Sequence, residues 1–240
     1  MFHYCCCLAL LEELQLHGTS FSEVIVNSRA FQRILLRFLK EEGSDVPVVL
    51  AENGKARIKR FFKQCAIPVM FLYRNSLLMW HAKRTRVMRR RYPDDSLILI
   101  DTFLYGADVR ERHYPTILDG LSPEERQKVY FVPTLCGPKQ LSRLFAELRT
   151  GEVNFLVKED YLLFRDYFYA LGHIWRALQR TLVGVRFRKF DVAPLIREEL
   201  IGGTGWTSAM EGLLNFQFVR RINDAGVRVR LAIDWFENQV

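Results

Sequence analysis

Asp101 is a candidate for acid–base chemistry because it follows an apolar run, Leu97–Ile100, and precedes a polar loop. In α/β proteins ligands bind beyond the carboxyl ends of the strands, where a carboxylate can deprotonate or hold a hydroxyl group. The loop carries Arg110, Arg112 and His113, whose charge-assisted hydrogen bonds suit a phosphorylated ligand. We expect Asp101 to be catalytic and the three loop residues to bind substrate. The alternative is that Asp101 caps a helix or pairs with an arginine.

A second pair of acids, Asp234 and Glu237, follows the last apolar strand, Val227–Ile233, which is predicted to be buried. Parallel strands have all their carboxyl ends at one edge of a sheet, so Asp234 and Asp101 are expected to share one cleft. We predict that Asp234 is catalytic and that Glu237 binds substrate. The alternative is structural, with Asp234 as a cap and Glu237 near a helix N-terminus.

Three glycines, Gly202, Gly203 and Gly205, precede a helix that is expected to start near Thr207. Backbone N–H groups exposed before a helix suit an anion, so the glycines are predicted to bind substrate through a phosphate. The stretch is not a dinucleotide fingerprint, because the preceding LIREEL has a helical pattern, and no Gly-Lys-Ser/Thr follows as in a P-loop. A flexible connection with Thr207 as N-cap is the alternative.

The stretch KRTRVMRRR, residues 83–91, is mostly basic and directly follows an apolar segment, IPVMFLYRNSLLMW. An apolar helix with a basic end is typical of a segment that lies on anionic lipid. We expect residues 67–91 to form a helical excursion and Arg89, Arg90 and Arg91 to bind a membrane. Nucleic acid is disfavoured as the partner, because the aromatic residues precede the basic run and do not alternate with it. A solvated helix end is the alternative.

The remaining reactive residues exclude several classes of site. The five cysteines form no CxxC pair, and the five histidines form no HExxH or HxxxH spacing, so neither a disulfide framework nor a metal is expected. No resident cofactor is expected either. The N-terminus lacks the basic region of a signal peptide, and no apolar run reaches the roughly 20 residues of a membrane span, so we expect a cytoplasmic protein.

Strand-like and helix-like segments alternate along the chain, which predicts an α/β fold with a Rossmann-like, doubly wound and mainly parallel sheet. Short apolar runs such as LILI and VYFV are typical of strands that are buried on both faces. Two stretches depart from the alternation, and we expect helical insertions at about residues 65–91 and 155–201. The predicted strands are Val24–Val26, Val48–Leu50, Leu97–Ile100, Val129–Val132 and Val229–Ile233.

The stretches IDTFLYGADVRERHYPTILDGL, VYFVPTL and LLNFQFVRRINDAGVRVRLAIDWFENQV resemble the N-terminal half of bacterial surface-polysaccharide glycosyltransferases of the GT-B type. In that family two Rossmann-like domains face each other across a cleft. The N-terminal domain usually holds the acceptor, and the C-terminal domain binds the nucleotide sugar. The resemblance covers about residues 22–240.

The resemblance implies a single Rossmann-like domain over residues 1–240, the acceptor-side part of a longer, two-domain glycosyltransferase of cell-surface polysaccharide biosynthesis. Such an enzyme transfers a sugar from a nucleotide donor to a lipid-linked or glycan acceptor, and a further domain would hold the donor. The isolated chain is therefore expected to be inactive, and to lie in the cytoplasm or peripherally on the inner face of the cell membrane. The net charge of +8 leaves an alternative, a non-catalytic basic α/β module that binds nucleic acid or anionic membrane.

Overall fold

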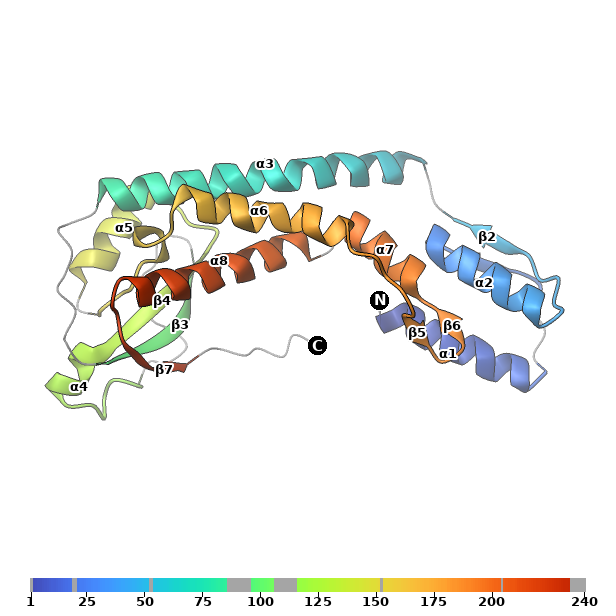
Figure 1. The fold of residues 1–240 in the computed structure, drawn as a ribbon, viewed down its shortest axis with the longest axis horizontal. Coiled ribbons are helices and arrows are strands. Elements are labelled where there is room, and N and C mark those ends of the chain that lie inside the picture. Colours follow the sequence, from blue (N-terminus) through green and yellow to red (C-terminus); the bar gives the residue numbers. More distant parts are fainter. Residues whose placement is uncertain are drawn as a thin grey trace. The chain divides into compact units, whose positions relative to one another are not determined.

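The structure is a computed structural model that describes residues 2–18, 21–51, 54–85, 96–105, 116–151, 153–203 and 205–233. It is a mixed α/β fold in which parallel sheets alternate with helices, so the predicted fold class is confirmed (Figure 1). The helices within these ranges are α1 (Phe2–Leu16), α2 (Arg29–Glu41), α3 (Gly54–Arg84), α4 (Pro123–Lys128), α5 (Leu141–Thr150), α6 (Phe164–Leu178), α7 (Ala193–Ile201), α8 (Trp206–Asp224) and the 3₁₀ helix η1 (Lys158–Asp160). The strands are β1 (Val24–Val26), β2 (Val48–Leu50), β3 (Leu97–Tyr105), β4 (Val129–Cys136), β5 (Arg186–Phe187), β6 (Phe190–Asp191) and β7 (Val229–Ile233).

The five predicted strands are all present, but they belong to two parallel sheets and not to one. Strand β1 pairs with β2, whereas β4, β3 and β7 form a three-stranded sheet in that order. Strands β5 and β6 form a short antiparallel pair. The alternation predicted a short crossover helix and then an insertion between β2 and β3. The structure has instead one continuous helix of 31 residues, α3, which is far longer than the crossover that joins neighbouring parallel strands.

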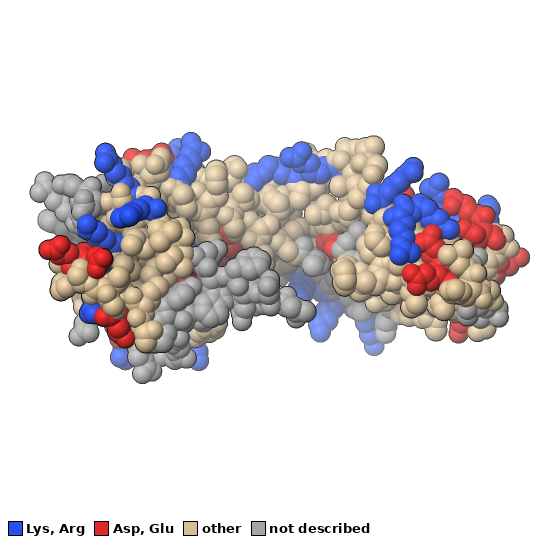
Figure 2. Space-filling model, turned by 90° about the horizontal axis from the view of Figure 1, so that it is seen from below, with Lys and Arg blue, Asp and Glu red and all other residues tan. Residues whose placement is uncertain are grey.

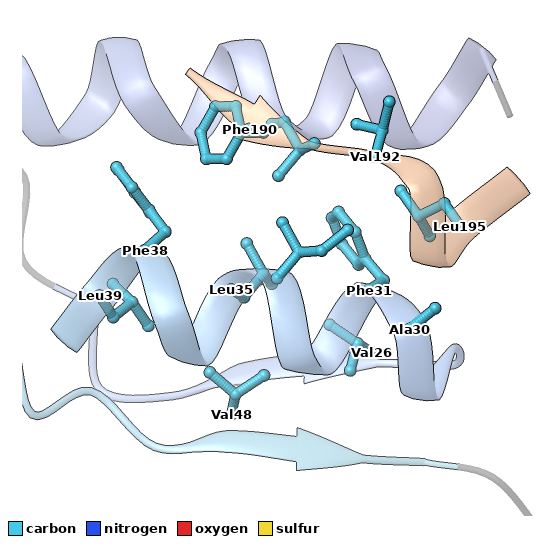
Figure 3. Close-up of a cluster of buried hydrophobic side chains, with 12 residues drawn as sticks. Val26, Ala30, Phe31, Leu35, Phe38, Leu39, Val48, Phe190, Val192 and Leu195 are labelled. Carbon is cyan, nitrogen blue, oxygen red and sulfur yellow. The ribbon is translucent and has the colours of Figure 1, made fainter. Parts of the chain in front are cut away.

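The chain divides into two compact units, and unit 1 comprises residues 1–70 and 171–210. Helix α2 lies at its centre because apolar residues recur along α2 every three or four positions. Ser28 starts this helix as its N-cap, accepting a hydrogen bond of 3.0 Å from the backbone N–H of Phe31. Figure 3 shows the side chains of α2 between those of the β1–β2 pair and those of the β6–α7 segment. The labelled core residues are Val26, Ala30, Phe31, Leu35, Phe38, Leu39, Val48, Phe190, Val192 and Leu195.

Unit 2 comprises residues 71–170 and 211–240 and contains the three-stranded sheet. One face of β3 and β4 is covered by α5 and by the end of α3, since Leu104 and Leu135 pack with Phe145 and Leu78. A second cluster surrounds Phe131. These buried contacts fix the carboxyl half of β3 against that of β4, which is the part of the sheet where a site was predicted.

The prediction that the last strand is buried is wrong. Four of the five residues of β7 are exposed, with Val229 at 41% and Leu231 at 49%. Because β7 is an edge strand that pairs only with β3 in the described sheet, its apolar side chains are not covered on both faces. The strand Val229–Ile233 was therefore predicted correctly, but its position in the sheet was not.

The two predicted insertions are largely helical, as expected. Helix α3 covers the described part of residues 65–91 and begins eleven residues earlier than the predicted insertion. Residues 155–201 form η1, α6, the β5–β6 pair and α7. The expectation of a single domain over residues 1–240 stays a prediction.

Acidic side chains accompany the basic ones on the face of the molecule that Figure 2 displays. In unit 1, at the right of that view, blue and red side chains lie close together. Ion pairs in this unit join Arg188 to Glu12 at 3.1 Å and Lys189 to Glu42 at 2.6 Å. The net positive charge is thus not gathered into one patch on that face. No helix among the described residues is long and apolar enough to cross a membrane.

Candidate functional site

Asp101 does not end its strand, so its predicted position at the strand tip is wrong. It is the fifth residue of β3, opposite Val132, and the pairing continues to Tyr105 opposite Cys136. The sequence suggested an earlier end because the apolar run LILI stops before Asp101. The partner strand β4 likewise continues past Pro133, since an edge strand tolerates a proline and β4 is an edge strand of this sheet. Asp101 is half-buried within the carboxyl half of β3.

A chain of side-chain hydrogen bonds connects Asp101 to the surface of unit 2. The Thr134 hydroxyl on β4 lies 3.4 Å from Asp101 Oδ1, to which it donates. Lys158 Nζ donates to the same hydroxyl at 3.1 Å and to Asn215 Oδ1 on α8 at 2.8 Å. The polar groups therefore come from β3, β4, η1 and α8, which are distant in sequence.

Lys158 is held in place by the rigid anchoring of η1. Arg149 at the end of α5 forms a bidentate ion pair with Asp160, with distances of 2.9 and 2.8 Å. The same guanidinium donates to the backbone oxygen of Ala82 at 2.8 Å, near the C-terminus of α3. A planar guanidinium suits this bidentate pairing, which fixes distance and orientation together.

A cavity of about 40 Å³ lies beside this network, and Thr134, Lys158 and Asn215 line part of it. A volume of this size holds a water molecule or one small polar group, but not a sugar ring. Tyr167 belongs to the lining, and its buried hydroxyl has no hydrogen-bond partner among the described residues although Tyr167 is only 4% exposed. Native proteins rarely leave a buried hydroxyl unsatisfied, so this group indicates a missing partner.

Burial sets the protonation of two groups at the cavity. Burial raises the pKa of the Tyr167 hydroxyl, and the nearby carboxylates of Glu159 and Glu211 raise it further, so the hydroxyl keeps its proton and can donate. Burial also raises the pKa of the Glu159 carboxyl, which Lys158 only partly opposes. Glu159 is half-buried as a residue.

The formal charges around the cavity balance. Arg74 lies 3.5 Å from Glu211 and donates to the backbone oxygen of Leu135 at 3.0 Å. Lys158 and Glu159 add one further charge of each sign. Two cations and two acids therefore line a space that also offers a hydroxyl, and such a lining favours a neutral polar ligand over an anion.

The three predicted glycines lie in unit 1, between α7 and α8, and none of them lines the cavity. Gly203 and Gly205 have positive φ values of 73° and 81°, which explains why glycine occupies them. Gly202 donates its N–H to the Glu198 oxygen at 2.7 Å and ends α7. The helix that follows begins at Trp206, close to the predicted Thr207. Their predicted role in holding a phosphate stays a prediction.

The other predicted site residues lie outside the described residues. They are Arg89, Arg90, Arg91, Arg110, Arg112, His113, Asp234 and Glu237. The shared cleft of Asp101 and Asp234 is therefore also still a prediction. Within the described residues no group of three or more His, Cys, Asp or Glu side chains could hold a metal ion.

Sequence reasoning missed Thr134, Lys158, Tyr167 and Asn215. Thr134 could have been found by extending the fourth strand past its proline. The other three lie on η1, α6 and α8, and only tertiary packing brings them together. Comparisons of the chain with protein-family models, with curated proteins and with solved structures found no match.

Proposed function

We propose that the chain is the acceptor-binding part of a glycosyltransferase of cell-surface polysaccharide biosynthesis, and that the cavity beside Tyr167 receives a hydroxyl group of the acceptor. The observation that carries this proposal is the Tyr167 hydroxyl, which is buried and has no partner among the described residues. The parallel α/β fold and the resemblance of the chain to GT-B enzymes support the same reaction class.

The lining of the cavity favours a sugar over a charged ligand. A sugar hydroxyl both donates and accepts, so it can satisfy the Tyr167 donor and a neighbouring acceptor at once. A phosphate would place negative charge next to Glu159 and Glu211, whereas the charges of Arg74 and Lys158 are already balanced by these acids. Because the cavity holds only one small group, the rest of the acceptor would lie outside it.

Asp101 has the role of general base in this proposal. It does not line the cavity, so the hydroxyl that it deprotonates is a different one from the hydroxyl held beside Tyr167. In the transfer, the acceptor oxygen forms a bond to the anomeric carbon of a nucleotide sugar, and the bond from that carbon to the phosphate oxygen breaks. The hydroxyl proton passes to the Asp101 carboxylate. Thr134 and Lys158 form the hydrogen-bonded chain that orients this carboxylate.

The test measures binding of neutral oligosaccharides and of sugar phosphates to the chain by ligand-observed NMR. We expect the neutral sugars to bind, and Tyr167→Phe to weaken them about fivefold to tenfold through the loss of one hydrogen bond. Tyr4→Phe is the matched control, because the Tyr4 hydroxyl already donates to Asn27 in unit 1.

Transfer itself is tested by adding nucleotide sugars to the protein that is expressed from its native gene. Asp101→Asn should remove transfer while it leaves acceptor binding within about twofold, since the amide keeps the size of the carboxylate. Failure of every saccharide to bind, or equal binding by the wild type and Tyr167→Phe, would contradict the proposal.

A further inference from the structure

One side of α3 within unit 1 exposes a series of large apolar side chains to water. Ile58, Phe62 and Val69 are spaced by four and seven residues, so they lie on one face of the helix. They are 60%, 67% and 65% exposed, and Phe61, which lies at the edge of this face, is 61% exposed. A soluble surface rarely gathers so many exposed apolar side chains unless the surface binds something. We call these four residues, Ile58, Phe61, Phe62 and Val69, the α3 apolar face.

The same helix is unusual in its charge. It contains no Asp or Glu from Gly54 to Arg84, while Lys55, Lys59 and Lys63 occur beside the α3 apolar face, one turn apart. All three lysines are exposed. In the part of the chain that the structure describes, neither Lys59 nor Lys63 takes part in an ion pair, whereas basic residues elsewhere in unit 1, such as Arg188 and Lys189, are paired with acids.

We propose that the α3 apolar face, flanked by Lys55, Lys59 and Lys63, lies on an anionic lipid surface. A helix of this kind places its apolar side chains at the boundary of headgroups and acyl chains, and its lysines against the lipid phosphates. An anionic lipid surface is the partner that fits, because its negative charge complements the lysines and its acyl chains match the apolar side chains of the face. The helix is too rich in charge to span the bilayer, in agreement with the absence of a spanning helix among the described residues.

Other partners fit this face less well. Nucleic acid would use the lysines but leave Ile58, Phe62 and Val69 without an apolar partner. A second copy of the chain packed symmetrically on the same face would bring two rows of lysines together with no acid on either helix to neutralise them. A lipid surface satisfies both kinds of side chain.

The proposal is independent of sugar transfer, and of its residues only Val69 lies in the segment 67–91 that the sequence predicted to lie on lipid. The predicted membrane-binding residues, Arg89, Arg90 and Arg91, follow α3 in the chain and lie outside the described residues. The lipid-binding surface proposed here is the first half of α3 and stands on its own exposure and charge.

The experiment measures co-sedimentation of the full chain with phosphatidylcholine vesicles that contain or lack phosphatidylglycerol. We expect binding to require the anionic lipid. Lys59→Ala combined with Lys63→Ala should weaken it about 30-fold, at about fivefold for each lysine. Phe62→Ser should weaken it about tenfold, since a phenylalanine side chain then no longer enters the interface.

Matched controls come from the same unit. Arg180→Ala combined with Arg186→Ala removes two exposed basic charges that are not part of α3, and Val183→Ser removes an apolar side chain that is 81% exposed. Both variants should bind vesicles as the wild type does. Circular dichroism and thermal unfolding of every variant establish that the fold is retained, which is expected because all substituted side chains are exposed.

Three outcomes would overturn the proposal. The first is equal binding to vesicles with and without anionic lipid. The second is an equal effect of the α3 variants and the controls. The third is that Phe62→Ser changes the oligomeric state or the binding of duplex nucleic acid, but not the binding of vesicles. Raising the salt concentration should weaken binding without abolishing it, because screening acts on the lysine contribution and not on the apolar one.

Discussion

Arg149 and Asp160 form a bidentate ion pair in which the two guanidinium nitrogens lie 2.9 and 2.8 Å from the two carboxylate oxygens. The side chains are only 13% and 16% exposed, so solvent screens the pair weakly. Asp160 is the last residue of η1, and Lys158 and Glu159 are the other two. The ion pair therefore anchors the short helix that carries two of the charges at the candidate site.

Arg149→Lys should lower the free energy of unfolding by about 2–3 kcal/mol. Lysine keeps the positive charge but cannot make both bonds to Asp160 and a third to the Ala82 oxygen. Urea denaturation measures the change. Arg143→Lys is the control on the same helix, because Arg143 pairs with Glu147 while 71% exposed, and we expect a change below about 0.5 kcal/mol. Equal effects of the two substitutions would show that burial of the pair has no energetic consequence.

The buried ion pair between Asp166 and Arg221 joins α6 to α8 within unit 2, at 2.7 and 3.0 Å. Burial tends to raise the pKa of Asp166, but hydrogen bonds from Arg221 and from the Leu163 N–H, with the Arg221 charge, hold that pKa below its ordinary value. Asp166→Asn should cost about 3 kcal/mol of stability at neutral pH, because Arg221 then loses its charged partner.

The pH dependence of this effect has a definite sign. Because the folded-state pKa of Asp166 is lowered, its contribution to stability is fully present above the ordinary value of 3.8 and is lost as the pH falls through the folded-state pKa. The wild type and Asp166→Asn should therefore differ by a constant amount near neutral pH and converge in acid. Asp224→Asn, whose carboxylate is 3.9 Å from Arg221 and 54% exposed, should show neither the loss nor the convergence.

Glu159 should show the opposite dependence on pH. Burial raises the pKa of its carboxyl above the ordinary value of 4.5, so the folded state holds the proton more tightly than the unfolded state. Glu159 therefore destabilises the fold progressively as the pH rises from 4.5 through the folded-state pKa. Glu159→Gln should raise the free energy of unfolding at pH 7 and leave it unchanged at pH 4, as measured by denaturation at both values. A loss of stability at pH 7 would mean that the carboxylate makes a favourable contact in its charged form.

The strands and the fold class could be predicted because they depend on local pattern. LILI and VYFV have the apolar, β-branched and aromatic composition of strands, and the helix of residues 29–41 repeats its apolar residues with helical spacing. The arrangement of strands into two sheets could not be predicted, because it depends on α3 continuing without interruption through Pro68. The ends of β3 and β4 were equally hidden, because the pairing of the two strands continues past Asp101 and Pro133 to Tyr105 and Cys136.

The candidate site was only partly visible in the sequence. Asp101 could be recognised because a carboxylate that directly follows an apolar run is uncommon, and because this pattern involves only neighbouring residues. Lys158, Tyr167 and Asn215 have no common motif, and they meet only because η1, α6 and α8 pack around the carboxyl half of β4. A residue such as Tyr167 becomes informative only when its burial and its lack of a partner among the described residues are known.

Tyr167→Phe provides a separate test of stability. The Tyr167 hydroxyl is buried and finds no acceptor among the described residues, so its transfer from water on folding is not compensated by a hydrogen bond. Phenylalanine removes this penalty and keeps the ring, so the free energy of unfolding should rise by about 1 kcal/mol. Tyr4→Phe, which loses a hydrogen bond to Asn27 at an exposed position, should lower it by less than about 1 kcal/mol.

A more stable Tyr167→Phe protein that binds its sugar more weakly is the combination expected when a hydroxyl is kept for a ligand. A less stable variant would show instead that the hydroxyl already has a partner within the fold, and the reason for assigning it to an acceptor would be lost.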